Sequence, residues 1–136
     1  MRQIYLAFAL TCAACSVAAA AGQTYLTDAI KDPSYLQSLT SLFNNAGKLP
    51  RWTVQVLKTS GDYVGTPVAY STVDGTRYAL FYACKAHDCA DNAMELMFAP
   101  NGAQAWAALV EDGKSVTYLG SPSAAQQAAL KKAFQK

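Results

Sequence analysis

The chain has 136 residues, of which 52% are hydrophobic and 15% are charged, and it carries a formal net charge of +2. A charge this small, with no run of lysine or arginine, excludes the basic footprint of a nucleic-acid-binding protein. The length suits one domain with an ordinary hydrophobic core.

The N-terminus has the three parts of a secretory signal peptide. Arg2 supplies the positive charge, residues 4–10 form an apolar core, and residues 13–21 form an alanine-rich run with A-x-A cleavage sites. The apolar core is too short to span a bilayer. We therefore predict a signal peptide over residues 1–21 and a single exported domain, without a membrane anchor, over residues 22–136.

Cleavage changes the cysteine count. Cys12 and Cys15 would leave with the signal peptide, so that Cys84 and Cys89 remain. An oxidising compartment outside the cytoplasm favours a disulfide between them. The alternative to cleavage after the alanine run is a lipoprotein acylated at Cys15, but Cys12 fits that type of signal poorly.

The first predicted element of the exported domain is a helix. Asp32 is placed to cap it and Pro33 to occupy its first turn, and Asn44, Asn45 and Gly47 mark its end. Apolar residues recur at helical spacing between these limits, namely Tyr35, Leu36, Leu39, Leu42 and Phe43. From Trp52 to Val56 apolar and polar residues alternate, which predicts a half-buried strand.

The following segment is divided by dipeptides that favour antiparallel turns, Asp74-Gly75, Asn101-Gly102 and Asp112-Gly113. Strands are predicted at Val68–Val73, Thr76–Cys84, Met94–Ala99, Ala103–Glu111 and Ser115–Leu119.

A last helix is predicted after Pro122, with Ser123 and Gln126 as its capping box. Its predicted inner stripe comprises Ala125, Ala129, Leu130, Ala133 and Phe134. The fold class is therefore α+β, with a mostly antiparallel five- or six-stranded sheet flanked by an N-terminal and a C-terminal helix. We expect the helices on one face or edge of that sheet.

The segment Cys84-Lys85-Ala86-His87-Asp88-Cys89 holds the only histidine of the chain, in a connection between two predicted strands. Four ligands within six residues cannot easily surround a zinc ion, so we expect neither a metal nor a cofactor. A hydrolase using His87 remains an alternative, although an adjacent aspartate does not readily orient an imidazole. A disulfide turn with solvated side chains is a third interpretation. A stiffened polar tip, however, suits insertion into a partner's pocket.

Two further sets of residues bear on function. Glu95 and Glu111 are the only glutamates, and Glu95 is expected to be solvated rather than to act as a glycosidase acid. Tyr63, Tyr82 and Trp106 are expected either to pack in the core or to contribute to the rim of a binding surface.

The hexapeptide resembles the signature loop, Cys-Lys-Pro-His-Asp-Cys, of the periplasmic inhibitors of vertebrate lysozyme (Ivy) of Gram-negative bacteria. Leu49-Pro50-Arg51-Trp52, the signal peptide, the length and the order of elements are also similar to that family. The chain has Ala86 where the motif has proline, so its loop is expected to be less pre-organised, which puts full inhibitory potency in question.

The resemblance implies a non-enzymatic, periplasmic inhibitor of c-type lysozyme that protects the cell wall. The loop from Cys84 to Cys89 would enter the active-site cleft, with the two cysteines holding its shape. His87 would meet the two catalytic carboxylates, while Lys85 and Asp88 would shape the loop and meet the cleft walls. Lytic transglycosylases of the same cell are an alternative target, and the family resemblance permits a homodimer.

Overall fold

The computed structural model describes residues 24–58 and 61–135, so the predicted signal peptide and its cysteines lie outside the described residues. The helical elements and strands run in the order α1 (Leu26–Ala29), α2 (Pro33–Asn45), α3 (Arg51–Val54), η1 (Gln55–Leu57), β1 (Tyr63–Gly65), β2 (Ala69–Val73), β3 (Thr76–Lys85), β4 (Ala93–Phe98), η2 (Pro100–Gly102), β5 (Ala105–Val110), β6 (Thr117–Leu119), α4 (Ala124–Lys131) and η3 (Lys132–Phe134). Within this part of the chain no helix is long and apolar enough to cross a membrane.

The six strands form one antiparallel sheet in the order β1-β3-β4-β5-β6, and β2 also pairs with β3. The long strand β3 pairs with β2 along residues 76–80 and with β1 along residues 83–85. The predicted α+β class with five or six antiparallel strands is confirmed, and β1 is the strand that the sequence pattern did not indicate.

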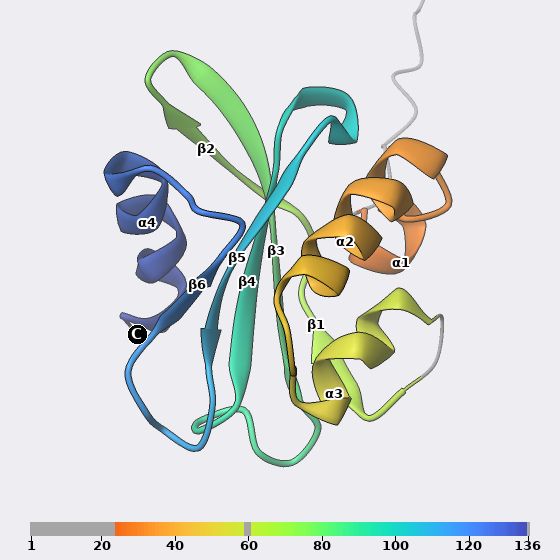
Figure 1. Cartoon of the computed structure of the whole chain (residues 1–136), viewed down its shortest axis with the longest axis vertical. Coiled ribbons are helices and arrows are strands. Elements are labelled where there is room, and N and C mark those ends of the chain that lie inside the picture. The colour runs from red at the N-terminus through yellow and green to blue at the C-terminus, as the bar shows by residue number, and fades with distance from the viewer. Residues whose placement is uncertain (1–23, 59–60, 136) are drawn as a thin grey trace, which may run out of the picture.

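Both faces of the sheet are covered, because α1, α2 and α3 pack on one face and α4 packs on the other (Figure 1). The placement of all helices on one face or edge is therefore wrong. Alternate residues of β4 and β5 enter the two cores: Leu96 and Ala107 join the α1–α3 core, while Met97 and Ala108 join the α4 core. All six residues of β4 are buried as a result.

The caps of the two longer helices are confirmed. The Asp32 carboxylate accepts a hydrogen bond from the Ser34 N–H at 2.8 Å, and Pro33 occupies the first position of α2. At α4, the Ser123 hydroxyl accepts from the Gln126 N–H at 3.2 Å, and the Gln126 side chain accepts from the Ser123 N–H at 2.8 Å. The predicted inner stripe of α4 is wrong at Ala125, which is exposed. Gln126 is buried in its place.

The strand predicted from Trp52 to Val56 is wrong, because these residues form α3 and η1. Trp52 and Val56 lie four residues apart and both are buried, as one face of a helical turn requires, while the intervening Val54 is 41% exposed. The hydroxyl of Thr53 donates to the Pro50 carbonyl at 2.7 Å and supports the helical turn.

Each predicted turn dipeptide has positive φ at both residues. Only Asp74-Gly75, with φ of 48° and 78°, forms a two-residue hairpin turn, between β2 and β3. Asn101-Gly102 and Asp112-Gly113 lie instead within longer connections, between β4 and β5 and between β5 and β6.

Glu95 is 5% exposed, so the expectation that it is solvated is wrong. It lies in the central strand β4, where helices cover both sheet faces, and it is opposite Tyr82 in the β3 register. Burial raises the pKa of the Tyr82 hydroxyl, and the nearby charge of Glu95 raises it further.

Two leucines of α2 test how far the α1–α3 core stabilises the fold. Leu39 is fully buried and Leu36 is 40% exposed. We expect Leu39→Ala to lower the free energy of unfolding by about 2–5 kcal/mol, because it leaves a cavity. Leu36→Ala on the same helix should change it by less than about 1 kcal/mol. Urea unfolding measures both, and equal losses would contradict this placement of the core.

Candidate functional site

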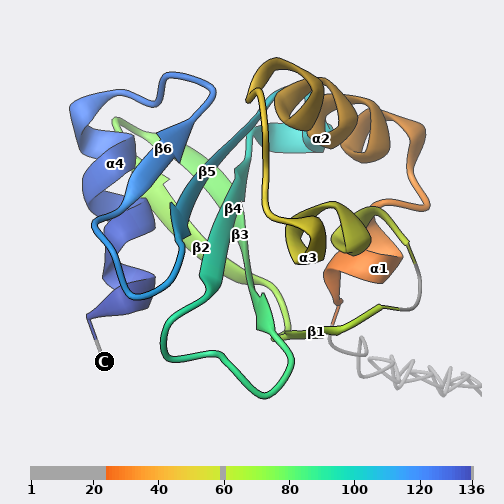
Figure 2. The same ribbon diagram turned by 60° about the horizontal axis from the view of Figure 1, so that its bottom comes forward.

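The hexapeptide from Cys84 to Cys89 is placed where the sequence predicted, at the end of the β3–β4 hairpin and at one end of the sheet (Figures 1 and 2). Cys84 is buried near the end of β3 and Cys89 is exposed in the connection. A disulfide joins them, with their Cα atoms 4.9 Å apart. All six residues are thereby gathered into one covalent ring, called the ring below.

His87 occupies the tip of the ring. The Asp88 N–H donates to the Lys85 carbonyl at 3.0 Å and closes a four-residue turn. His87 is the third residue of this turn and has φ of 65°. A positive φ at that place is typical of a type II turn, and histidine tolerates it better than most residues do. The imidazole is exposed, and therefore accessible to a partner.

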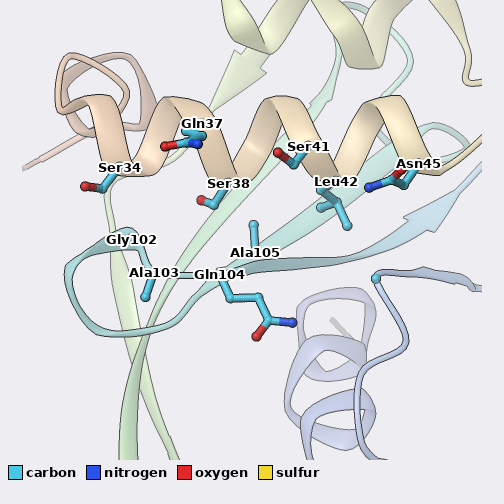
Figure 3. Close-up of a pocket in the computed structure, with 11 residues that line it drawn as sticks. Ser34, Gln37, Ser38, Ser41, Leu42, Asn45, Gly102, Ala103, Gln104 and Ala105 are labelled. Atoms are coloured by element: carbon cyan, nitrogen blue, oxygen red, sulfur yellow. The ribbon is translucent and has the colours of Figure 1, made fainter.

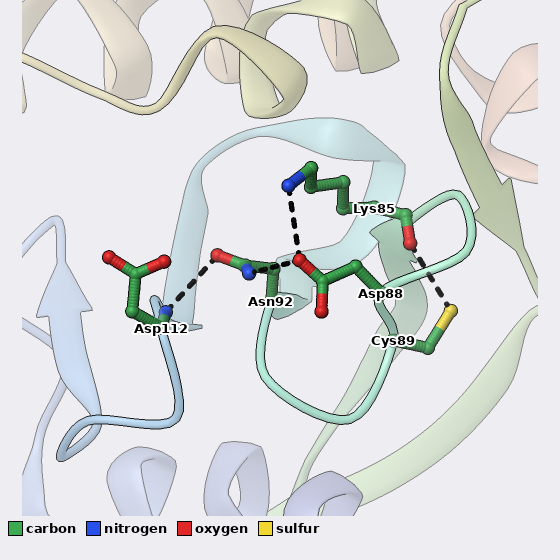
Figure 4. Close-up of polar contacts among 5 residues, drawn as sticks. All are labelled: Lys85, Asp88, Cys89, Asn92 and Asp112. Atoms are coloured by element: carbon green, nitrogen blue, oxygen red, sulfur yellow. Dashed lines mark hydrogen bonds and ion pairs between the residues drawn. The ribbon is translucent and has the colours of Figure 1, made fainter.

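The carboxylate of Asp88 is bound by two neighbouring side chains (Figure 4). Its Oδ2 lies 3.0 Å from the Lys85 Nζ and accepts a hydrogen bond from the Asn92 Nδ2 at 2.8 Å. The Lys85 hydrogen bond lowers the pKa of the Asp88 carboxyl, and the Asn92 bond and the Lys85 charge lower it further against the opposing effect of burial. The ring thus exposes the imidazole of His87, while the carboxylate of Asp88 is bound to Lys85 and Asn92.

Asn92 is the site residue that sequence reasoning missed. It is 4% exposed and lies just before β4. Besides donating to Asp88, its Oδ1 accepts from the Asp112 N–H in the β5–β6 connection at 3.2 Å (Figure 4). The neighbouring Gly113 N–H donates to the Asp91 carbonyl at 2.8 Å. No local sequence pattern predicts these contacts, because the partners of Asn92 lie up to twenty positions away.

The other side of the ring is held by a bond that the family proline could not make. The Ala86 N–H donates to the Asp62 carbonyl at 3.0 Å, which extends the pairing of β1 with β3 by one residue. Proline has no N–H to donate. The ring is therefore tied to β1 through Ala86 and to the β5–β6 connection through Asn92.

Two surface hollows flank the ring. One, of about 580 Å³, lies on the α3 side and is lined by Arg51, Trp52, Asp62, Lys85, Asn92 and Glu111, among others. The second, of about 840 Å³, lies on the α4 side and is lined by Tyr82, Cys89, Lys114, Tyr118 and Phe134, among others. Lys85 and Cys89 of the ring thus line two different hollows.

A third hollow, of about 470 Å³, lies between α2 and the β4–β5 connection (Figure 3). It is lined by neutral side chains such as Ser38, Ser41, Asn45 and Gln104. The connection that lines it leaves the end of β4 opposite the ring, so this hollow is not part of the ring site.

The three aromatic residues considered for a binding rim take different places. Trp106 is buried in the α4 core, with its ring 5.8 Å from that of Tyr78. Tyr82 packs near Phe134 at 6.4 Å and lines the hollow beside Cys89. Tyr63 is half-buried, and its hydroxyl donates to the Lys58 carbonyl at 3.2 Å. Two members of this set thus border the ring site, Tyr82 through the hollow beside Cys89 and Tyr63 through its pairing with Lys85.

Over residues 24–58 and 61–135, no group of three or more histidine, cysteine or acidic side chains is arranged to hold a metal ion. The ring has an exposed imidazole on a hydrogen-bonded turn, and every residue of β4 behind it is buried. Such a loop on a rigid scaffold is typical of recognition. Fold and site together define a small α+β domain with a disulfide-closed loop exposed at one end of its sheet.

A family model described as inhibitor of vertebrate lysozyme (Ivy) matches residues 49–136, and the chain belongs to this family. The matched segment includes α3, the whole sheet, the ring and α4. A search of curated proteins found no match to the chain. The resemblance drawn from the hexapeptide is thereby confirmed at the level of the family.

The lowered pKa of Asp88 gives a test of the ring's geometry. The Lys85–Asp88 pair should contribute stability above the unfolded pKa of about 3.9 and lose it as the pH falls through the lower folded pKa. We expect carboxyl NMR titration to place the pKa of Asp88 below its ordinary value, and Lys85→Met to raise it. An Asp88 pKa unmoved by Lys85→Met would show that the pair does not form in solution.

Proposed function

We propose that this protein is exported through the signal peptide of residues 1–21 and inhibits c-type lysozymes in the periplasm by placing the ring in their active-site cleft. Membership of an inhibitor family supports inhibition as the function. The observation that carries the mechanism is the exposed His87 at the tip of a disulfide ring, on a hairpin fixed by both cores.

The chemistry of the target explains the role of a histidine. Retaining glycosidases such as lysozyme hold two catalytic carboxyl groups about 5–5.5 Å apart. An imidazole between them can donate to one or both, and an imidazolium forms stronger, charge-assisted bonds. Cys84 and Cys89 hold the turn, and Lys85 and Asp88 pair with each other at its base. The mechanism is occlusion of the cleft, with no covalent step.

Affinity for the lysozyme should come from the fit of the loop more than from long-range attraction. C-type lysozymes are typically basic, and this chain has a net charge of only +2, which becomes about +1 without Arg2. Electrostatic steering should therefore add little to the association rate. The hollows on either side of the ring offer the additional contact area with the cleft walls.

Inhibition of lysozyme-catalysed lysis of cell walls tests the proposal. Purified, oxidised protein should slow lysis by a c-type lysozyme at micromolar concentration or below. Failure to bind or slow any c-type lysozyme would contradict it. The same assay with the cell's own lytic transglycosylases separates the alternative target, and cell-wall cleavage by this protein alone would indicate the hydrolase alternative. Sedimentation measures whether it forms the homodimer that the resemblance permits.

His87→Ala tests the histidine. We expect a loss of about 1–3 kcal/mol of binding free energy, because charge-assisted bonds in a desolvated cleft are lost. Asp74→Ala, at another positive-φ turn position, is the matched control and should inhibit normally. Unchanged inhibition by His87→Ala removes the imidazole from the mechanism.

Ala86→Pro tests whether the departure from the family motif weakens the ring. Proline would restrict φ, worth about 0.4–1 kcal/mol where it fits, but it would remove the hydrogen bond to the Asp62 carbonyl, worth about 0.5–1.5 kcal/mol. The two effects nearly offset, so the inhibition constant should change by less than about tenfold. A larger gain in potency would show that flexibility at Ala86 limits the wild-type protein.

A further inference from the structure

We propose that Asn92 is the positioning residue of the ring: it orients the turn that carries His87 by holding Asp88 and fixes that turn to the β5–β6 connection. This inference rests on the proposed function, because it assigns to Asn92 the pre-organisation on which inhibition depends. Asn92 itself lies outside the ring and is 4% exposed, so it acts through its neighbours.

Four hydrogen bonds meet at this one residue. Its backbone carbonyl accepts from the Lys85 N–H at 3.0 Å, and its own N–H donates to the Asp88 carbonyl at 3.0 Å. Its side chain donates to the Asp88 Oδ2 at 2.8 Å and accepts from the Asp112 N–H at 3.2 Å (Figure 4). A buried amide with both ends bonded is costly to disturb, since either end left alone keeps its desolvation penalty.

The disulfide alone does not supply this orientation. It closes the ring through Cys84, which is anchored in β3, and Cys89, which is exposed. Asp88, which directly follows His87, is half-buried, and its carboxylate bonds only with Lys85 and Asn92 among the described contacts. Lys85 is itself 46% exposed at its side chain and on a flexible stem. Asn92 is therefore the rigid partner of the pair.

The role of Asn92 is tested directly by replacing its donor amide, which bonds Asp88, with an acceptor. Asn92→Asp keeps the shape and the acceptor for the Asp112 N–H, but it sets a carboxylate against that of Asp88. We expect inhibition of a c-type lysozyme at pH 7.5 to weaken about tenfold, as a lost bond of about 1.4 kcal/mol implies. Asn101→Asp, the same substitution in the β4–β5 connection, is the matched control and should inhibit as wild type does.

The double variant Asp88→Asn with Asn92→Asp reverses the two partners and restores the bond. Its inhibition should return to within about threefold of wild type. If Asn92→Asp alone fails to fold, the double variant still decides the matter, because an inactive but folded double variant overturns the inference.

A readout without lysozyme separates the inference from the proposed function. In Asn92→Asp the equilibrium constant for reduction of Cys84–Cys89 by dithiothreitol should rise severalfold, because the oxidised ring loses its support. It should fall back in the double variant and stay unchanged in Asn101→Asp. Wild-type protein that fails to inhibit lysozyme contradicts the proposed function alone, whereas reduction equilibria equal in all variants contradict the role of Asn92.

Discussion

The pairing of β3 with β4 is the constraint on which the rest of the structure depends. It sets Cys84 opposite Ala93, so that the rest of the ring and Asn92 must fit within the eight residues between them. Its register is firmly fixed, because every residue of β4 is buried and a slip of one residue would exchange the two cores. The disulfide and the hydrogen bonds of Asn92 then act on a segment whose ends are already placed. Rigidity of the tip is a property of the whole hairpin.

Features with local signals could be predicted from the sequence. Asp32 and Pro33 mark the start of α2, Ser123 and Gln126 mark α4, and the cysteine spacing locates the ring between two strands. Features decided by tertiary packing could not. Glu95 is buried because α4 covers the second face of the sheet, and an alternating pattern does not reveal that cover.

The short elements could not be predicted from the sequence for a similar reason. The alternation from Trp52 to Val56 also fits two buried positions four residues apart, and packing against the sheet selects the helical form. The elements α1 and β1 have four and three residues, too few to show a period. At the site, Asn92 contacts Asp88 within its own connection, but Asp112 belongs to the β5–β6 connection, and only the fold brings it to Asn92.

Our central proposal is that the ring occupies the active-site cleft of a c-type lysozyme. The most direct measurement is competition between this protein and an oligosaccharide of N-acetylglucosamine for the same lysozyme, followed by calorimetry. We expect mutually exclusive binding, with the apparent dissociation constant of this protein rising linearly with the concentration of free sugar. A ternary complex, in which both bind with undiminished affinity, would contradict it.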